Sequence, residues 1–273
     1  MLEVGAMFWA APDATAKLRE LKSLGVNCGQ LGVAGDFPVD DAAPAWKSAL
    51  AEEKFKLQTV FAAYIGEDYA DIPTVERTVG FIPESTRNER EQRTLELSDF
   101  GAALGVKSIA CHIGFVPEDH SDKNYVAVRN LVRRICDHAA ENGQTFALET
   151  GQEPAATLLE FFKDVDRPNL GINFDPANMI LYGTGDPIEA LGVLGPHVIS
   201  VHAKDGNWPR KDQPGTLGVE RPLGSGSVGI PRYIAKLKDV GYLGQINIER
   251  EGTSPEQWRN DVGAAVRLLQ SLI

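Results

Sequence analysis

The chain alternates apolar strand-like runs with helical stretches eight times, and this alternation constrains its fold more than any other feature of the sequence. Strands that alternate with helices form a parallel sheet covered by helices. Eight complete units, with no element left over, favour closure into a (βα)8 TIM barrel over an open doubly wound sheet. We therefore predict an α/β fold with a single domain over residues 1–273. The predicted strands are Leu2–Trp9, Cys28–Val33, Lys56–Tyr64, Ser108–Phe115, Phe146–Glu149, Leu170–Asp175, Val198–Lys204 and Gln245–Arg250.

The predicted helices follow each strand and carry recognisable start and stop signals. Asp186 followed by Pro187, for example, is the pattern of a helix that begins with an aspartate cap. Two stretches, Gly66–Pro83 and Asp205–Gly229, are predicted to be long loops. The predicted helices are Asp13–Leu24, Asp40–Lys54, Ser85–Leu104, Lys123–Asn142, Pro154–Asp164, Asp186–Gly195, Ile230–Val240 and Ser254–Leu272.

Composition and charge exclude several classes of function. The formal net charge of −11 disfavours nucleic acid and anionic membranes as partners, because both require clusters of Lys and Arg. No apolar run approaches the ~20 residues of a membrane span, and the N-terminus lacks a basic signal-peptide region. The cysteines, Cys28, Cys111 and Cys136, have no metal-binding spacing and suit buried thiols in a reducing compartment. We therefore expect a cytoplasmic protein.

Four consecutive predicted strands end in residues that could bind a metal ion. Glu149 ends the fifth strand and Asp175 the sixth, while His202 and Glu249 lie near the ends of the seventh and eighth. In a barrel these ends meet at one mouth, where catalytic residues lie. Three carboxylates packed together repel each other unless a cation lies between them. Three oxygen donors and one imidazole favour one divalent ion, Mn²⁺ first, with Mg²⁺, Co²⁺ or Zn²⁺ as alternatives.

Other residues near this mouth are candidates for substrate binding. His112 lies on the fourth strand and can donate a hydrogen bond to substrate. Lys204 lies two residues after His202 in the strand, so both side chains are expected to point into the barrel. Lys204 could therefore hold a substrate oxygen or an anionic group. A salt bridge between Lys204 and Asp205 is the alternative. Trp9 and Gln30 are candidates for the pocket wall.

Several phrases of the sequence resemble the xylose isomerase-like TIM barrel family of sugar phosphate isomerases and epimerases. They are ALETGQE, GINFDPANM, VHAKDG and PLGSGSVGIPRYIAKLKDVGYLGQINIERE. The resemblance implies that Glu149, Asp175, His202 and Glu249 are the metal ligands. It also implies that the two glutamates are the acid and base on opposite faces of the substrate, as in the ketose epimerases of that family.

The sequence departs from the ketose epimerase pattern at two positions. Asn178 stands where those enzymes carry a substrate-contacting histidine, and it cannot carry a proton. Trp208 stands where they carry an arginine, so Arg210 is a candidate replacement. The absence of a histidine at Asn178 raises the weight of an alternative reaction on the same scaffold.

The predicted function is that of a divalent-metal-dependent sugar isomerase or epimerase in carbohydrate metabolism. A proton is abstracted next to a metal-bound carbonyl, and an enediolate forms. The alternative is a metal-dependent lyase or dehydratase acting on a keto-sugar or keto-inositol. Two other classes of function are disfavoured. An endonuclease of the same family would require more histidines and a basic face, which this chain lacks. A binding protein without turnover would not require the glutamate pair, which this chain has.

Two further points concern possible ligands and partners. Gly224 to Gly229 matches GxGxxG but follows a long loop, not a strand, so a dinucleotide site is rejected and a phosphate site remains an alternative. The expected partner is a small sugar or keto-sugar, with no nucleic acid and no membrane. Family members often form dimers or tetramers, so a homo-dimer or tetramer is compatible with the resemblance.

Overall fold

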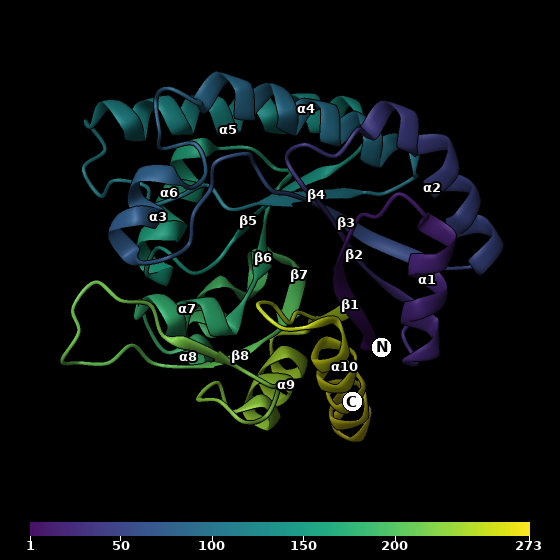
Figure 1. Ribbon diagram of the computed structural model, residues 1–273. Helices are drawn as coiled ribbons and strands as arrows, with labels where there is room; N and C mark the ends of the chain where they lie inside the picture. The colour runs from purple at the N-terminus through teal and green to yellow at the C-terminus, as the bar shows by residue number, and fades with distance from the viewer.

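A computed structural model describes residues 1–273 and confirms the predicted (βα)8 barrel (Figure 1). The eight parallel strands close in the order β1-β10-β7-β6-β5-β4-β3-β2. In this register Glu149 lies opposite Asn173, and His202 lies opposite Asn247. The strands are β1 (Glu3–Trp9), β2 (Cys28–Val33), β3 (Lys56–Ala62), β4 (Ser108–Cys111), β5 (Thr145–Glu149), β6 (Leu170–Phe174), β7 (Val198–Ala203) and β10 (Gln245–Ile248).

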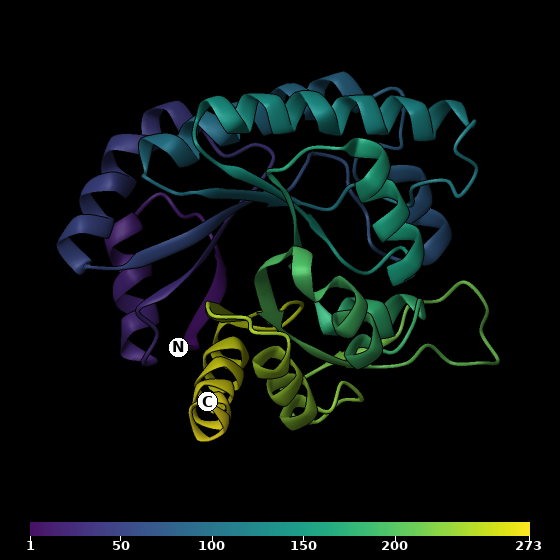
Figure 2. The ribbon, with the colours of Figure 1, turned by 180° about the vertical axis from the view of Figure 1, so that it is seen from behind.

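The helices form a ring around the barrel, and the long helices α4 and α5 lie side by side on one flank in both ribbon views (Figures 1 and 2). The two chain ends lie close together, and Leu2 and Ile273 line the same surface hollow. None of the helices combines the length and apolar character needed to cross a bilayer. The ring comprises α1 (Ala14–Ser23), α2 (Val39–Glu53), α4 (Arg87–Ala103), α5 (Lys123–Glu141), α6 (Ala155–Val165), α8 (Pro187–Leu194), α9 (Ile230–Asp239) and α10 (Pro255–Leu272).

Five short elements were not predicted, and three of them, α3, β8 and β9, correct the two long-loop assignments. Asp71 caps α3 by accepting the N–H of Thr74, within the stretch that was predicted to be a loop. The hairpin of β8 and β9 lies inside the second stretch, and its connecting segment projects from the barrel mouth (Figure 1). The fourth strand also ends at Cys111 and not at Phe115. The added elements are α3 (Ile72–Thr78), α7 (Pro176–Tyr182), the 3-10 turn η1 (Gly195–His197), β8 (Asp205–Asn207) and β9 (Val219–Arg221).

The inside of the barrel is partly polar, although it also holds a small apolar cluster of Met7, Phe61, Ala110 and Ala147. Apolar side chains fill the layer between strands and helices, whereas the barrel centre holds buried amides and hydroxyls. Asn173 accepts hydrogen bonds from Gln30 and Ser200, and Asn247 donates to Gln58. Most buried polar groups in proteins are hydrogen-bonded, and the bonds of this network fix side-chain directions just below the barrel mouth.

Candidate metal and substrate site

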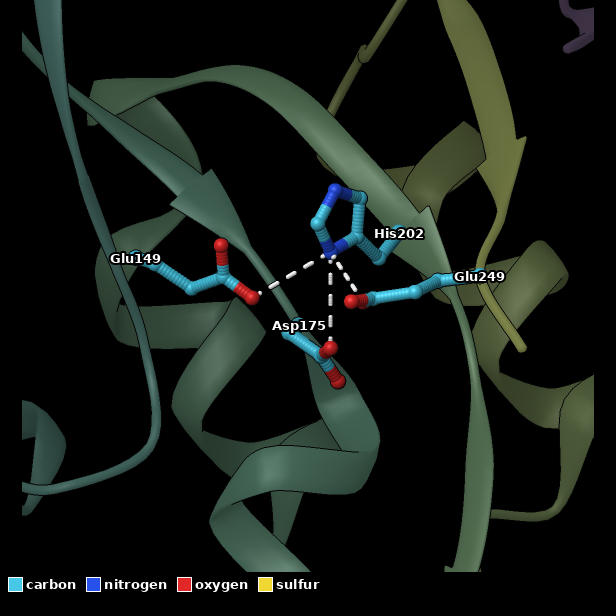
Figure 3. A group of neighbouring side chains, drawn as sticks. All are labelled: Glu149, Asp175, His202 and Glu249. Atoms are coloured by element: carbon cyan, nitrogen blue, oxygen red, sulfur yellow. Dashed lines mark ion pairs between the residues drawn. The ribbon is translucent and has the colours of Figure 1, made fainter. Parts of the chain in front are cut away.

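The structure brings the four predicted metal-binding side chains together at the C-terminal mouth of the barrel (Figure 3). Glu149 is the last residue of β5, Asp175 follows β6, His202 lies in β7 and Glu249 follows β10. One donor atom from each residue lies within 4.8 Å of all the others. Nδ1 of His202 is 2.7 Å from Oε2 of Glu249, 3.2 Å from Oε1 of Glu149 and 3.4 Å from Oδ2 of Asp175.

The donor atoms that converge are buried and mostly lack hydrogen-bond partners. Nδ1 of His202, Oδ2 of Asp175 and Oε2 of Glu249 make no hydrogen bond. Burying such polar atoms without partners costs roughly 1–3 kcal/mol each. Three carboxylate oxygens and an imidazole nitrogen around one point are the ligand set of a divalent cation. The residues therefore fit a resident metal ion, and the orphaned atoms are the ones that would bind it.

The charges at the site are strongly coupled. Burial by itself lowers the pKa of His202, but the carboxylates of Glu249 and Glu149 raise it well above its ordinary value. Burial likewise raises the pKa of Glu249, yet Lys204 and His202 bring it below its ordinary value. Without a cation, a proton on His202 and the Lys204 ammonium offset part of the negative charge of the three carboxylates.

The second ring nitrogen of His202 is held by a residue outside the ligand set. Nε2 lies 2.9 Å from the amide oxygen of Gln30, which can only accept a hydrogen bond. Nε2 therefore keeps its proton, and once the second proton leaves Nδ1, the lone pair of Nδ1 would face the carboxylates. Asn173 links the same network to Glu149 by donating to its Oε2 at 3.1 Å.

Asp175 performs two tasks with its two oxygens. Oδ1 accepts the N–H groups of Ala177 and Asn178 at 2.7 and 2.9 Å, which caps α7. Pro176 occupies the first turn, as is common after such a cap. The cap fixes the carboxylate, so its other oxygen, Oδ2, is aimed at the cluster.

A cavity of about 200 Å³ opens directly above the cluster. Four of the residues predicted to bind substrate, His112, Asn178, Lys204 and Trp9, line it. Nδ2 of Asn178 donates to Oε1 of Glu149 at 3.0 Å, and Nζ of Lys204 is 3.3 Å from Oε1 of Glu249.

Two predicted substrate-binding residues lie elsewhere. Gln30 is fully buried beneath His202 and does not line the cavity. Arg210 is exposed on the loop before β9, where its guanidinium pairs with Asp212 at 2.8 Å. The sequence gives the strand of Gln30 but not its depth in the barrel, and an irregular loop gives no position for Arg210.

The cavity also contains residues that sequence reasoning missed. Glu251 contacts Lys204 at 3.3 Å, and its spacing of two from Glu249 was an available signal. Tyr69, Tyr182 and Glu220 line the same cavity. Tyr69 lies on a loop, Tyr182 on α7 and Glu220 on β9. No local sequence pattern indicates that these elements approach the mouth.

The backbone N–H groups of the glycine-rich segment after β9 already bind a carboxylate of the protein itself. Asp205 accepts backbone N–H groups of Gly224 and Gly226 at 2.9 Å and of Val228 at 3.1 Å. A side chain at Gly226 would collide with this carboxylate, because its Cβ would lie 2.2 Å from Oδ1. The salt bridge between Lys204 and Asp205 that we considered is not formed, since Lys204 pairs with Glu249 and Glu251.

Comparisons with known proteins are consistent with this architecture. The family model for the xylose isomerase-like TIM barrel matches residues 18–272. A xylose isomerase domain protein of Planctomyces limnophilus is 41% identical, with a TM-score of 0.92, over 98% of this chain and 96% of that one.

More distant structures share the fold. A D-allulose 3-epimerase of Methylomonas sp., solved with D-allulose, is 18% identical with a TM-score of 0.73, over 100% of this chain and 97% of that one. The probable 3-DHS dehydratase AsbF of Bacillus anthracis is 16% identical with a TM-score of 0.70, over 98% and 99% of the two chains. An uncharacterized protein of Methanocaldococcus jannaschii is 31% identical over 160 residues, 54% of this chain and 52% of the relative. The chain thus spans about half the length of that relative.

Proposed function

Because the chain belongs to the xylose isomerase-like TIM barrel family, we propose that it is a divalent-metal-dependent sugar isomerase or epimerase. One observation carries the proposal. Three buried donor atoms without hydrogen-bond partners, on Asp175, His202 and Glu249, converge with Glu149 beneath a cavity of about 200 Å³. Such a cluster suits a metal ion at the floor of a substrate pocket.

The ligands of the cation would be Oε1 of Glu149, Oδ2 of Asp175, Nδ1 of His202 and Oε2 of Glu249. Mn²⁺ suits this set, as do Mg²⁺, Co²⁺ and Zn²⁺. When bound, a divalent ion supplies Lewis-acid polarisation of a ketone oxygen, which acidifies the neighbouring C–H bond. Gln30 and the α7 cap hold His202 and Asp175 in the orientations that this requires.

In this proposal the two glutamates move the proton. Glu149 and Glu249 reach the cluster from opposite sides (Figure 3). Each has one oxygen toward the centre, and its other oxygen is held by Asn173 in Glu149 and by Lys204 in Glu249. The central oxygen of Glu149 also accepts a hydrogen bond from Asn178. One carboxylate removes the proton from the carbon beside the ketone, and the other returns a proton from the opposite face, which inverts the centre.

The remaining cavity residues orient the substrate. His112 and Asn178 offer hydrogen bonds close to Glu149, where the reacting hydroxyl groups would lie. The Lys204 ammonium lies beside Glu249 and stabilises negative charge on the enediolate of the substrate. Phe61 and Tyr69 supply an apolar wall for the C–H faces of a sugar ring.

A lyase or dehydratase acting on a keto-sugar or keto-inositol is the second candidate. Lys204 favours it, because a buried ammonium next to the acid/base carboxylate of Glu249 could also stabilise a departing β-hydroxyl group. The first steps of the two reactions are the same, and only the fate of the enediolate differs.

Incubation of the Mg²⁺-loaded protein with ketoses and keto-sugars in deuterium oxide tests this proposal. If NMR shows that deuterium enters at one carbon and that the substrate loses no water, the result supports an isomerase or epimerase. An unsaturated product supports the lyase. Exchange that persists after the protein is stripped with a chelator would contradict the metal dependence, and no exchange across the panel would contradict the proton-transfer function.

A further inference from the structure

The walls of the substrate cavity carry an excess of negative charge. Glu67, Glu220, Glu249 and Glu251 line the cavity, and Glu149 and Asp175 lie at its floor. Lys204 is the one cationic side chain among the lining residues. Even with a divalent cation bound, the carboxylates outnumber the positive charges, so the cavity would still repel an anion.

The cations at this site are already paired with carboxylates. Nζ of Lys204 is 3.3 Å from Glu249 and 3.3 Å from Glu251, and the residue is 4% exposed. Arg250, behind the wall, is 2.6 Å from Glu220 and 2.8 Å from Asp261. A substrate phosphate or carboxylate would have to displace one of these partners, which would leave a carboxylate unpaired in a partly buried setting.

The backbone groups that usually bind phosphate in such barrels are also engaged. The amides of Gly224, Gly226 and Val228 converge on the carboxylate of Asp205, which is 1% exposed. A phosphate at this place would meet a buried negative charge instead of free donors. The nearby arginine candidate, Arg210, is exposed and paired with Asp212.

We propose that the substrate is an uncharged sugar ketone and that the cavity rejects phosphorylated and carboxylated sugars. The inference rests on the proposed function for its reaction, but its evidence is the charge and pairing of the walls. Trp9, Phe61, Tyr69 and Tyr182 give the cavity apolar faces, which suit the C–H surfaces of a neutral sugar and contribute nothing to an anion.

Matched pairs of substrates test the inference by activity. D-fructose, D-ribulose and D-xylulose are each compared with their own terminal phosphates, and solvent deuterium incorporation is followed by NMR with the Mg²⁺-loaded protein. We expect the neutral member of a reactive pair to exchange at least tenfold faster. A phosphate ester that exchanges as fast as its parent sugar would overturn the inference.

A binding measurement decides the same point without turnover. Inorganic phosphate is titrated by calorimetry into the Mg²⁺-loaded wild-type protein, Glu251→Gln and the control Glu256→Gln, which changes an exposed glutamate of α10. We expect weak binding to the wild type and the control, and about tenfold tighter binding to Glu251→Gln, because Lys204 loses one of its partners. Wild-type binding as tight as that of Glu251→Gln would overturn the inference. If no sugar of the panel exchanges, the proposed function fails, and this titration still decides the charge preference.

Discussion

The amide oxygen of Gln30 lies 2.9 Å from Nε2 of His202, across the interior of the barrel. The two residues come from β2 and β7, which are not neighbouring strands. Gln30 also donates to Asn173 at 2.9 Å, so its amide orientation is fixed at both ends. The pair therefore determines which ring nitrogen of His202 faces the carboxylates.

Replacement of Gln30 by Met removes this acceptor while keeping the side-chain length. His202 can then rotate or change tautomer, and we expect the affinity for Mn²⁺ to fall by about 10- to 100-fold. Calorimetric titration of the metal-free protein with Mn²⁺ measures the effect. Activity at saturating Mn²⁺ should change much less, because the ligand atoms themselves remain.

Gln58→Met is the matched control for this variant. Gln58 is another barrel amide, bonded to the backbone of Ile199 and to Tyr242, and it does not touch His202. Its loss should affect stability but not metal affinity. Equal Mn²⁺ affinities for the two variants would contradict the role assigned to Gln30.

The Glu149→Gln and Glu249→Gln variants should each slow solvent deuterium exchange by about 10²- to 10⁴-fold, because each removes one proton-transfer carboxylate. Both also weaken metal binding, so rates must be compared at full metal occupancy. Asp175→Asn is the control: its amide oxygen can still cap α7, while its NH₂ group replaces the metal-facing oxygen, so it loses a predicted metal ligand but no acid/base carboxylate. If Glu249→Gln exchanges as fast as Asp175→Asn when both are saturated, Glu249 is not an acid/base residue.

Metal binding should release a proton from His202. Burial lowers the pKa of the metal-free imidazole, but Glu249 and Glu149 raise it well above its ordinary value, so the proton must leave before Nδ1 can bind a cation. Affinity should therefore rise about tenfold per pH unit until the pH reaches that raised pKa. Calorimetry in two buffers with different ionisation enthalpies measures the released proton. Identical apparent enthalpies in both buffers would contradict this prediction.

The fold and the cluster of the four predicted metal ligands could be predicted because both follow from regular patterns. Alternation of strands and helices specifies the barrel. A residue at the C-terminal end of a parallel strand then has a defined place, so Glu149, Asp175, His202 and Glu249 had to lie at one mouth. No knowledge of loop conformation was needed.

The missed features depend on irregular or long-range structure. The Asp175-Pro176 pair carries the same capping signal as Asp186-Pro187, but Asp175 also ends a predicted strand, so α7 was not predicted. Arg210 lies on a loop whose path the sequence does not specify. The position of Gln30 depends on how the strands are staggered around the barrel, which a single strand does not reveal.

Glu153 should make stability depend on pH. Burial raises the pKa of this carboxyl to about 7, although it accepts the N–H of Val116 at 2.8 Å. Because the folded pKa lies above the unfolded one, its contribution to stability is present below the unfolded pKa and is lost as pH rises through about 7. Relative to the wild type, Glu153→Gln should therefore gain about 2 kcal/mol in unfolding free energy between pH 5.5 and pH 8.

Urea unfolding at the two pH values measures this gain for Glu153→Gln. Glu118→Gln, which changes an exposed glutamate of the same region, is the control and should show no such trend. Parallel behaviour of the two variants would show that the Glu153 carboxyl does not titrate differently in the folded protein.

Asp205 should be among the most sensitive positions outside the metal cluster. Its Oδ2 accepts from Gly224 and Gly226, and its Oδ1 accepts from Gly206 and Val228. Asp205→Asn would place an NH₂ group against two of these donors, at a cost of about 3 kcal/mol in unfolding free energy. Urea unfolding measures the loss, and Asp212→Asn, on an exposed part of the same loop, should cost less than about 0.5 kcal/mol. Equal losses for the two variants would mean that the Asp205 carboxylate does not hold the glycine-rich segment. In that case the backbone N–H groups of this segment would be available to a substrate phosphate.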